Sequence, residues 1–141
     1  MRPRSRYRLI EHTADIGIAV ENPSLEGLFE DAAFGMFDLV SDLSRVETRE
    51  SLRIELEAEG LEDLFAEWLR ELLFQSETKS LLFKSFNLSI SSFRSLSGEA
   101  SGEAYDANRH ELYRELKAVT YHGLRVEQDK GIWRARVIFD V

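Results

Sequence analysis

The chain has 141 residues, of which 43% are hydrophobic and nine are Phe, enough apolar material for the core of one folded domain. It contains no cysteine, which excludes a disulfide framework and a thiolate metal site. The net charge is −8, and positions 21–77 hold 16 acidic but only 4 basic residues. These charges could simply solvate helical surfaces. They would also repel a phosphate backbone, so we expect no stable nucleic-acid binding and favour a basic protein partner.

Neither a targeting signal nor a membrane span is evident. The basic residues at positions 2–6 are not followed by the apolar segment of a secretory signal. No apolar run approaches the roughly 18 residues that a membrane span needs. We therefore expect one domain over residues 1–141, located in the cytoplasm and without membrane contact.

An apolar stretch from Tyr7 to Val20 is interrupted by His12, Thr13 and Asp15. Polar groups inside a strand pair are costly to bury without partners, so this interruption favours either a turn or a site. His12 could ligate a metal or orient Asp15, but it could equally be a hydrogen-bonded structural residue. Thr13 is a candidate hydrogen-bond donor to the Asp15 carboxylate.

Two segments predict amphipathic helices. The first follows Ser24, a residue type favoured at the N-cap, and the second follows Gly60. In both, apolar residues recur at the three- and four-residue spacing of a single helical face. These residues are Leu25, Leu28, Phe29, Ala32, Ala33, Met36, Phe37 and Val40 in the first, and Leu61, Leu64, Phe65, Trp68, Leu69, Leu72 and Leu73 in the second. Both begin Leu-Glu-x-Leu-Phe, which is compatible with an internal duplication.

The other regular segments alternate between apolar and polar residues, as strands with one buried face do. Such segments lie at 52–58, 86–90, 118–122, 124–128 and 132–140, and a hairpin turn is expected at Asp129-Lys130-Gly131. The stretch Ser95–Gly102, rich in Ser and Gly, is predicted to be a mobile loop or the edge of a sheet. Together these segments predict an α+β fold in which two helices pack on a mostly antiparallel sheet.

The C-terminal strand ends at Asp140 and Val141, which places a side-chain carboxylate next to the terminal α-carboxylate. If this end meets Asp15 in space, the three carboxylates form an anionic cluster that needs a cation or protons. Oxygen-only ligands favour Mg²⁺, Ca²⁺ or Mn²⁺ over zinc. The alternative is that Asp15 closes a β-turn and Asp140 lies on a frayed strand end.

Lys117 and His122 lie near Tyr121 in a region dense in ionisable groups. They could form a phosphate- or metal-handling surface, or they could be structural. The charged residues at 109–115 are predicted to form a solvated loop. No nucleophile with a base at recognisable spacing appears, and there is no glycine-rich phosphate loop.

Three segments in combination resemble the archease family: His12–Ile16, Lys117–His122 and Val137–Val141. The resemblance covers essentially the whole chain and includes the stretch Gly102–Asp106. Isoleucine is common at the position of Val141, a difference without consequence if the backbone carboxylate is the ligand.

The resemblance implies a non-enzymatic activator of an RtcB-type RNA ligase, which promotes ligase guanylylation and multiple turnover in tRNA splicing and RNA repair. It also implies that Asp15, Asp140 and the Val141 carboxylate bind a divalent metal ion such as calcium. Two other functions stay open at this point. One is a stand-alone metal-dependent phosphoester hydrolase, and the other is a general protein-binding modulator or chaperone.

Overall fold

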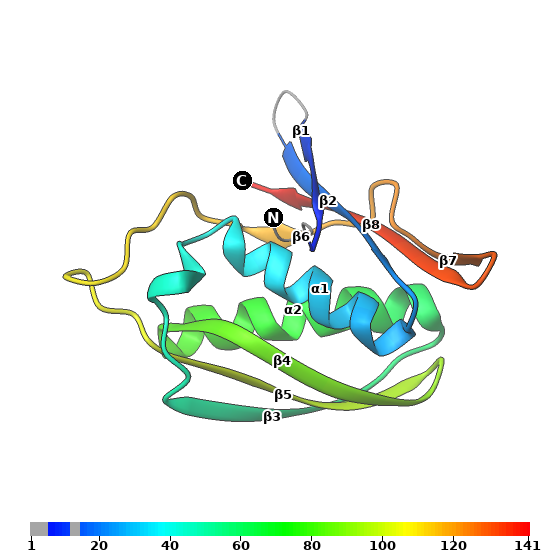
Figure 1. The fold of residues 1–141 in the computed structure, drawn as a ribbon, viewed down its shortest axis with the longest axis horizontal. Helices are drawn as coiled ribbons and strands as arrows, with labels where there is room; N and C mark the ends of the chain where they lie inside the picture. Colours follow the sequence, from blue (N-terminus) through cyan, green and yellow to red (C-terminus); the bar gives the residue numbers. More distant parts are fainter. Residues whose placement is uncertain (1–5, 12–14) are drawn as a thin grey trace, which may run out of the picture.

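The computed structural model describes residues 6–11 and 15–141 (Figure 1), so His12 and Thr13 lie outside the described residues. The helices are α1 (Leu25–Asp38), α2 (Leu61–Lys79) and a short 3-10 helix, η1 (Leu43–Arg45). The strands are β1 (Arg8–Glu11), β2 (Asp15–Asn22), β3 (Glu50–Glu57), β4 (Leu81–Ser92), β5 (Ser95–Ala104), β6 (Ala118–Val119), β7 (Arg125–Asp129) and β8 (Ile132–Asp140). Within the described ranges, no helix has both the length and the apolarity that crossing a bilayer requires.

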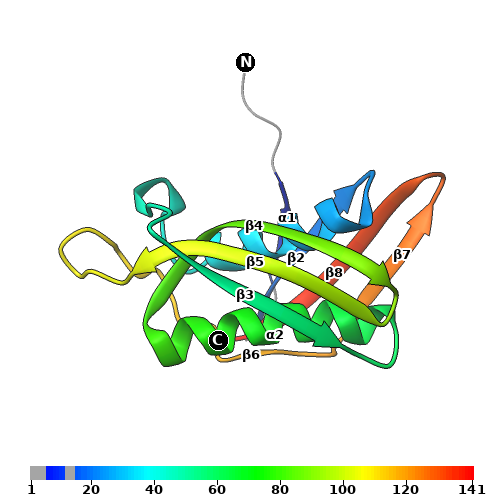
Figure 2. The same ribbon diagram turned by 90° about the horizontal axis from the view of Figure 1, so that it is seen from below.

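The two helices lie between two sheets and contact both of them (Figure 1). The five-stranded sheet has the order β1-β2-β8-β6, and β7 also pairs with β8. The three-stranded sheet has the order β3-β5-β4, with β5 in the middle (Figure 2). All pairings between these strands are antiparallel. The predicted α+β class is therefore confirmed, although the strands form two sheets where the alternation pattern had suggested one.

Both predicted helices are present, and their apolar faces form the core. Ser24 caps α1, because its Oγ accepts a hydrogen bond from the Gly27 N–H at 2.9 Å. Trp68 of α2 is fully buried, and its indole N–H donates to the Phe29 carbonyl of α1 at 3.0 Å. This bond joins the two helices at the centre of the molecule.

The stretch Ser95–Gly102 is neither a mobile loop nor a sheet edge, so that prediction was wrong. It belongs to β5, the central strand of the three-stranded sheet. A Cβ at Gly98 would lie 3.2 Å from the Trp68 ring and 2.9 Å from the Leu88 Cβ. The small residues thus leave room for a large side chain that packs across the strand.

The predicted hairpin at Asp129-Lys130-Gly131 is confirmed between β7 and β8. Lys130 and Gly131 both have positive φ values, 51° and 81°, as a two-residue hairpin turn of this kind requires. The strand expected at 118–122 is shorter, because only Ala118 and Val119 pair with β8. The segment after β6 turns back toward β7 instead.

A buried ionic cluster anchors the segment between β5 and β6. Glu103 is only 4% exposed and accepts hydrogen bonds from Arg109 (2.7 Å) and the Glu47 backbone N–H (2.8 Å). His110 is 3% exposed; its Nδ1 accepts from the Asp106 N–H, so its Nε2 donates to Glu103 at 3.0 Å. The prediction of a solvated loop is therefore wrong for Arg109 and His110, because both are tied to a buried carboxylate.

These bonds favour the ionised carboxylate, and they make Glu103 a source of pH-dependent stability. The hydrogen bond from Arg109, followed by that from the Glu47 N–H, lowers the Glu103 pKa to about 2. A lowered folded-state pKa gives stability that is complete above the unfolded value of about 4.3 and disappears as the pH falls toward 2.

We expect Glu103→Gln to lower the melting temperature at neutral pH, because the amide cannot replace the charged acceptor. The difference from wild type should shrink as the pH falls from about 5 to about 2. Thermal melts across this range, with the exposed Glu59→Gln as the matched control, measure both effects. A constant difference at every pH would show that Glu103 does not contribute through its charge.

Candidate functional site

The two ends expected to meet do lie side by side. Asp15, the first residue of β2, is the direct register partner of Asp140, the last residue of β8. Figure 1 shows these two strands side by side. Directly opposed side chains of an antiparallel pair have Cβ atoms about 4.5–5.5 Å apart and project from the same face. The neighbouring partners Ile16 and Phe139 are buried in the core, so Asp15 and Asp140 belong to the outer face of the sheet.

The two carboxylates carry charge without a cationic partner. Among residues 6–11 and 15–141, no lysine or arginine forms an ion pair with Asp15 or Asp140, and no donor bonds to either carboxylate. Asp15 is half-buried, whereas Asp140 and Val141 are exposed. Like charges directly opposite each other destabilise a strand pair. The pair is therefore suited to take up a cation.

Lys117 is brought to the same strand end. Its backbone N–H donates to the Asp140 carbonyl at 2.8 Å, and the next residue, Ala118, is the register partner of Asp140. The Lys117 side chain is exposed beside the chain end.

His122 is not brought to the carboxylate pair by any described contact. Its backbone N–H donates to the Thr120 hydroxyl at 3.3 Å, and its side chain is exposed. The ring of neighbouring Tyr121 lies against the Arg70 guanidinium, 5.3 Å from the ring centroid, on the side of α2. No described contact joins Lys117 to His122, which the sequence had grouped together.

The donor set fits a hard cation that retains water ligands. Among the described residues, no three His, Cys, Asp or Glu side chains converge as a metal site. Asp15 and Asp140 supply two carboxylates, and the α-carboxylate of Val141 follows Asp140 directly. Three anionic oxygen groups suit Mg²⁺, Ca²⁺ or Mn²⁺, with water completing the coordination, and do not suit a soft metal.

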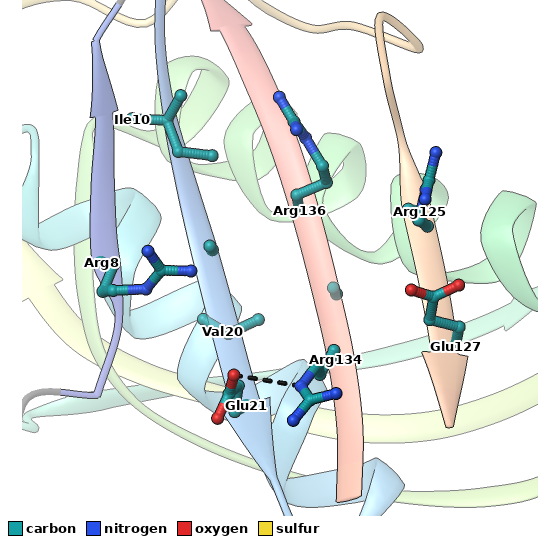
Figure 3. A pocket seen from close by; sticks show the side chains of 10 residues that line it. Arg8, Ile10, Val20, Glu21, Arg125, Glu127, Arg134 and Arg136 are labelled. Carbon is teal, nitrogen blue, oxygen red and sulfur yellow. Dashed lines mark hydrogen bonds and ion pairs between the residues drawn. The ribbon is translucent and has the colours of Figure 1, made fainter. Parts of the chain in front are cut away.

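A second polar feature, which the sequence did not predict, lies on the outer face of the same sheet. A groove of about 380 Å³ is lined by Arg8, Arg125, Arg134 and Arg136 (Figure 3). Positions 108–136 hold 7 basic and 4 acidic residues, but this excess does not include Arg8 and does not show which arginines share a face.

Comparison with known proteins identifies the family. Residues 7–141 match the Archease protein family (MTH1598/TM1083). The protein archease of Methanopyrus kandleri is 40% identical over 135 residues, covering 94% of this chain and 96% of the relative. The protein archease of Pyrococcus abyssi is 37% identical over 140 residues, covering 96% of this chain and 99% of the relative.

Solved structures agree with these matches. The solution structure of Methanobacterium thermoautotrophicum protein 1598 has a TM-score of 0.84 and 35% identity, covering 98% of this chain and 100% of that one. An archease from Thermotoga maritima, described as a possible chaperone, has a TM-score of 0.61 and 22% identity, covering 100% and 98%, and shows the fold alone. With two helices between antiparallel sheets and a family match over nearly its whole length, this chain belongs to the Archease protein family.

Proposed function

We propose that this protein is a metal-binding activator of an RtcB-type RNA ligase, acting in the cytoplasm in tRNA splicing and RNA repair. Its effect would be to promote guanylylation of the ligase and multiple turnover. One observation carries the proposal: the β2–β8 register sets Asp15 opposite Asp140 at the chain end, where the archease resemblance expects the metal ligands.

In this proposal Asp15, Asp140 and the Val141 α-carboxylate hold the divalent cation. A metal bound there supplies positive charge that can neutralise a transferring phosphoryl group. The exposed strand end lets these groups enter the site of a partner. Lys117 would contact the partner or a phosphate beside the metal, and His12, Thr13 and His122 are further candidate contacts.

A stand-alone hydrolase is less well supported than an activator. Among residues 6–11 and 15–141, no histidine and no further acidic side chain joins Asp15 and Asp140 in a metal site, and His12 lies outside these residues. General acid–base catalysis needs such a group within hydrogen-bond reach of the reacting atoms. A general chaperone would not require the carboxylate pair at all; the Thermotoga maritima archease is described as a possible chaperone.

The test is a ligation time course with limiting ligase, GTP and a divalent metal. Wild type should increase the number of turnovers per ligase, and the isosteric Asp15→Asn should not, although it stays folded. Glu57→Gln, a strand-end carboxylate of the other sheet, is the matched control and should activate fully.

Two results would contradict the proposal. One is full activation by Asp15→Asn. The other is phosphoester hydrolysis by the purified protein without ligase, which would favour the enzyme.

A further inference from the structure

The groove on the outer face of the five-stranded sheet contains a row of arginines set by strand register. Arg8 pairs with Ala19, Ala19 with Arg136, and Arg136 with Arg125, so four adjacent strands contribute one residue each. Directly opposed residues of antiparallel strands share a face. Figure 3 shows Arg8, Arg136 and Arg125 along this face, which the helices leave open because they cover the other side.

Arg134, the fourth arginine of the groove, is neutralised by ion pairs, whereas the three arginines of the row are not. Arg134, in the next row, pairs with Glu21 at 3.1 Å (Figure 3) and also with Asp129 at 3.2 Å. Within residues 6–11 and 15–141, no carboxylate pairs with Arg8, Arg125 or Arg136. Three positive charges therefore line one groove without an ion pair among the described residues, and the same groove is also lined by Glu21 and Glu127.

Arg136 also has an unsatisfied donor. Its Nε is buried and has no acceptor among the described residues. An unpaired buried donor of a charged group costs more than a neutral one, and like charges directly opposite each other are destabilising. Arg125 and Arg136 are two such like charges, directly opposite each other on β7 and β8. An anion in the groove would offset the repulsion between Arg125 and Arg136.

The central residue of the row leaves space for that anion. Ala19 lies between Arg8 and Arg136 and carries only a methyl group, so the two longer side chains flank an open floor. The volume of about 380 Å³ is within the range of small-molecule sites.

We propose that the row formed by Arg8, Arg136 and Arg125 binds the phosphate group of a small ligand, such as a nucleotide. A carboxylate has two coplanar oxygens, which one guanidinium can satisfy in a bidentate pair. Donors arriving from three strands suit a phosphate, which offers three acceptor oxygens and up to two negative charges. The net charge of −8 and the adjacent Glu21 and Glu127 disfavour a polynucleotide.

This phosphate site is distinct from the carboxylate pair on the same face. Arg136 and Asp140 are four residues apart on β8, about 13 Å at the rise of an extended strand. Between them lies an apolar row, Ile10–Gly17–Ile138. Phosphate binding should therefore persist without a divalent metal.

The test is calorimetric titration of the intact protein with inorganic pyrophosphate, ATP and a single-stranded oligoribonucleotide, all with chelator present. Wild type should bind pyrophosphate and ATP more tightly than the oligonucleotide. Each of Arg125→Met and Arg136→Met should weaken pyrophosphate binding about tenfold, the effect of one lost charge-assisted bond. Arg53→Met, an exposed arginine of the other sheet, should bind as wild type does.

Ala19→Glu keeps the proposal testable if an arginine variant fails to fold. A glutamate carboxylate at position 19 would form ion pairs with the neighbouring Arg8 and Arg136. It should therefore abolish pyrophosphate binding and raise the melting temperature. Tighter binding of ATP than of pyrophosphate would identify a nucleotide, and equal binding would identify the phosphate alone.

Four results would overturn the proposal: no binding of pyrophosphate or ATP, unchanged binding by the arginine variants or by Ala19→Glu, preferred binding of the oligonucleotide, or loss of binding in Asp140→Asn.

Discussion

Trp68→Ala should lower the free energy of unfolding by about 3–5 kcal/mol, the usual cost of removing a large buried aromatic side chain. Trp68 is fully buried, and its ring is in an edge-to-face arrangement with Phe86 at 6.4 Å. It also donates the hydrogen bond to Phe29 that joins α2 to α1. Because the ring lies against Gly98, which has no side chain to fill the space, the resulting cavity cannot easily close. Denaturant unfolding monitored by circular dichroism measures the loss.

Phe74→Ala on the same helix is the matched control, because Phe74 is 57% exposed. It should change the free energy of unfolding by no more than about 0.5 kcal/mol, as surface substitutions usually do. A similar loss in both variants would contradict the assignment of the effect to core packing, because Ala has a higher helix propensity than Trp or Phe and cannot lower stability that way.

The contact between Trp68 and Gly98 explains which parts of the fold were predictable from the sequence. The helices were predictable, because the spacing of their apolar residues and the Ser24 cap are local signals. Strand β5 was not, because its inward-facing residues include Gly98 and Ala100, which fit beneath the helices by being small. A composition of Ser and Gly is typical of loops, and only the packing of Trp68 shows why a central strand needs it.

A C-terminal extension should abolish ligase activation, whereas Val141→Ile should have no effect. The extension converts the Val141 α-carboxylate into a neutral amide and removes one charge from the proposed metal site. Val141→Ile adds a single methylene to a side chain that is 46% exposed and leaves the carboxylate unchanged. The ligation time course measures both.

The matched control carries the same extension at the N-terminus, and circular dichroism confirms that all forms are folded. Normal activation by the C-terminally extended protein would remove the terminal carboxylate from the site. A defect in Val141→Ile would show instead that the side chain contacts the partner.

The candidate site was only partly predictable from the sequence. The sequence led us to expect Asp15 beside Asp140 only on the condition that the two ends meet, with the ligand set implied by the archease resemblance, and the β2–β8 register meets that condition. The row of Arg8, Arg136 and Arg125 could not be predicted, because it depends on the register between β1–β2 near the start of the sequence and β7–β8 near its end. Glu103 was equally hidden, since a charged residue in a polar stretch gives no sign that it will be buried.

The most direct test of the central claim is a calorimetric titration of Ca²⁺ into the untagged and the C-terminally extended protein. If Asp15, Asp140 and the Val141 carboxylate form the site, the untagged protein should bind one cation. The extended protein should bind it more weakly, because the affinity of such sites follows the charge of their ligands. Equal affinity in the two forms, or no binding in either, would contradict the claim that the two ends of the chain form a metal site.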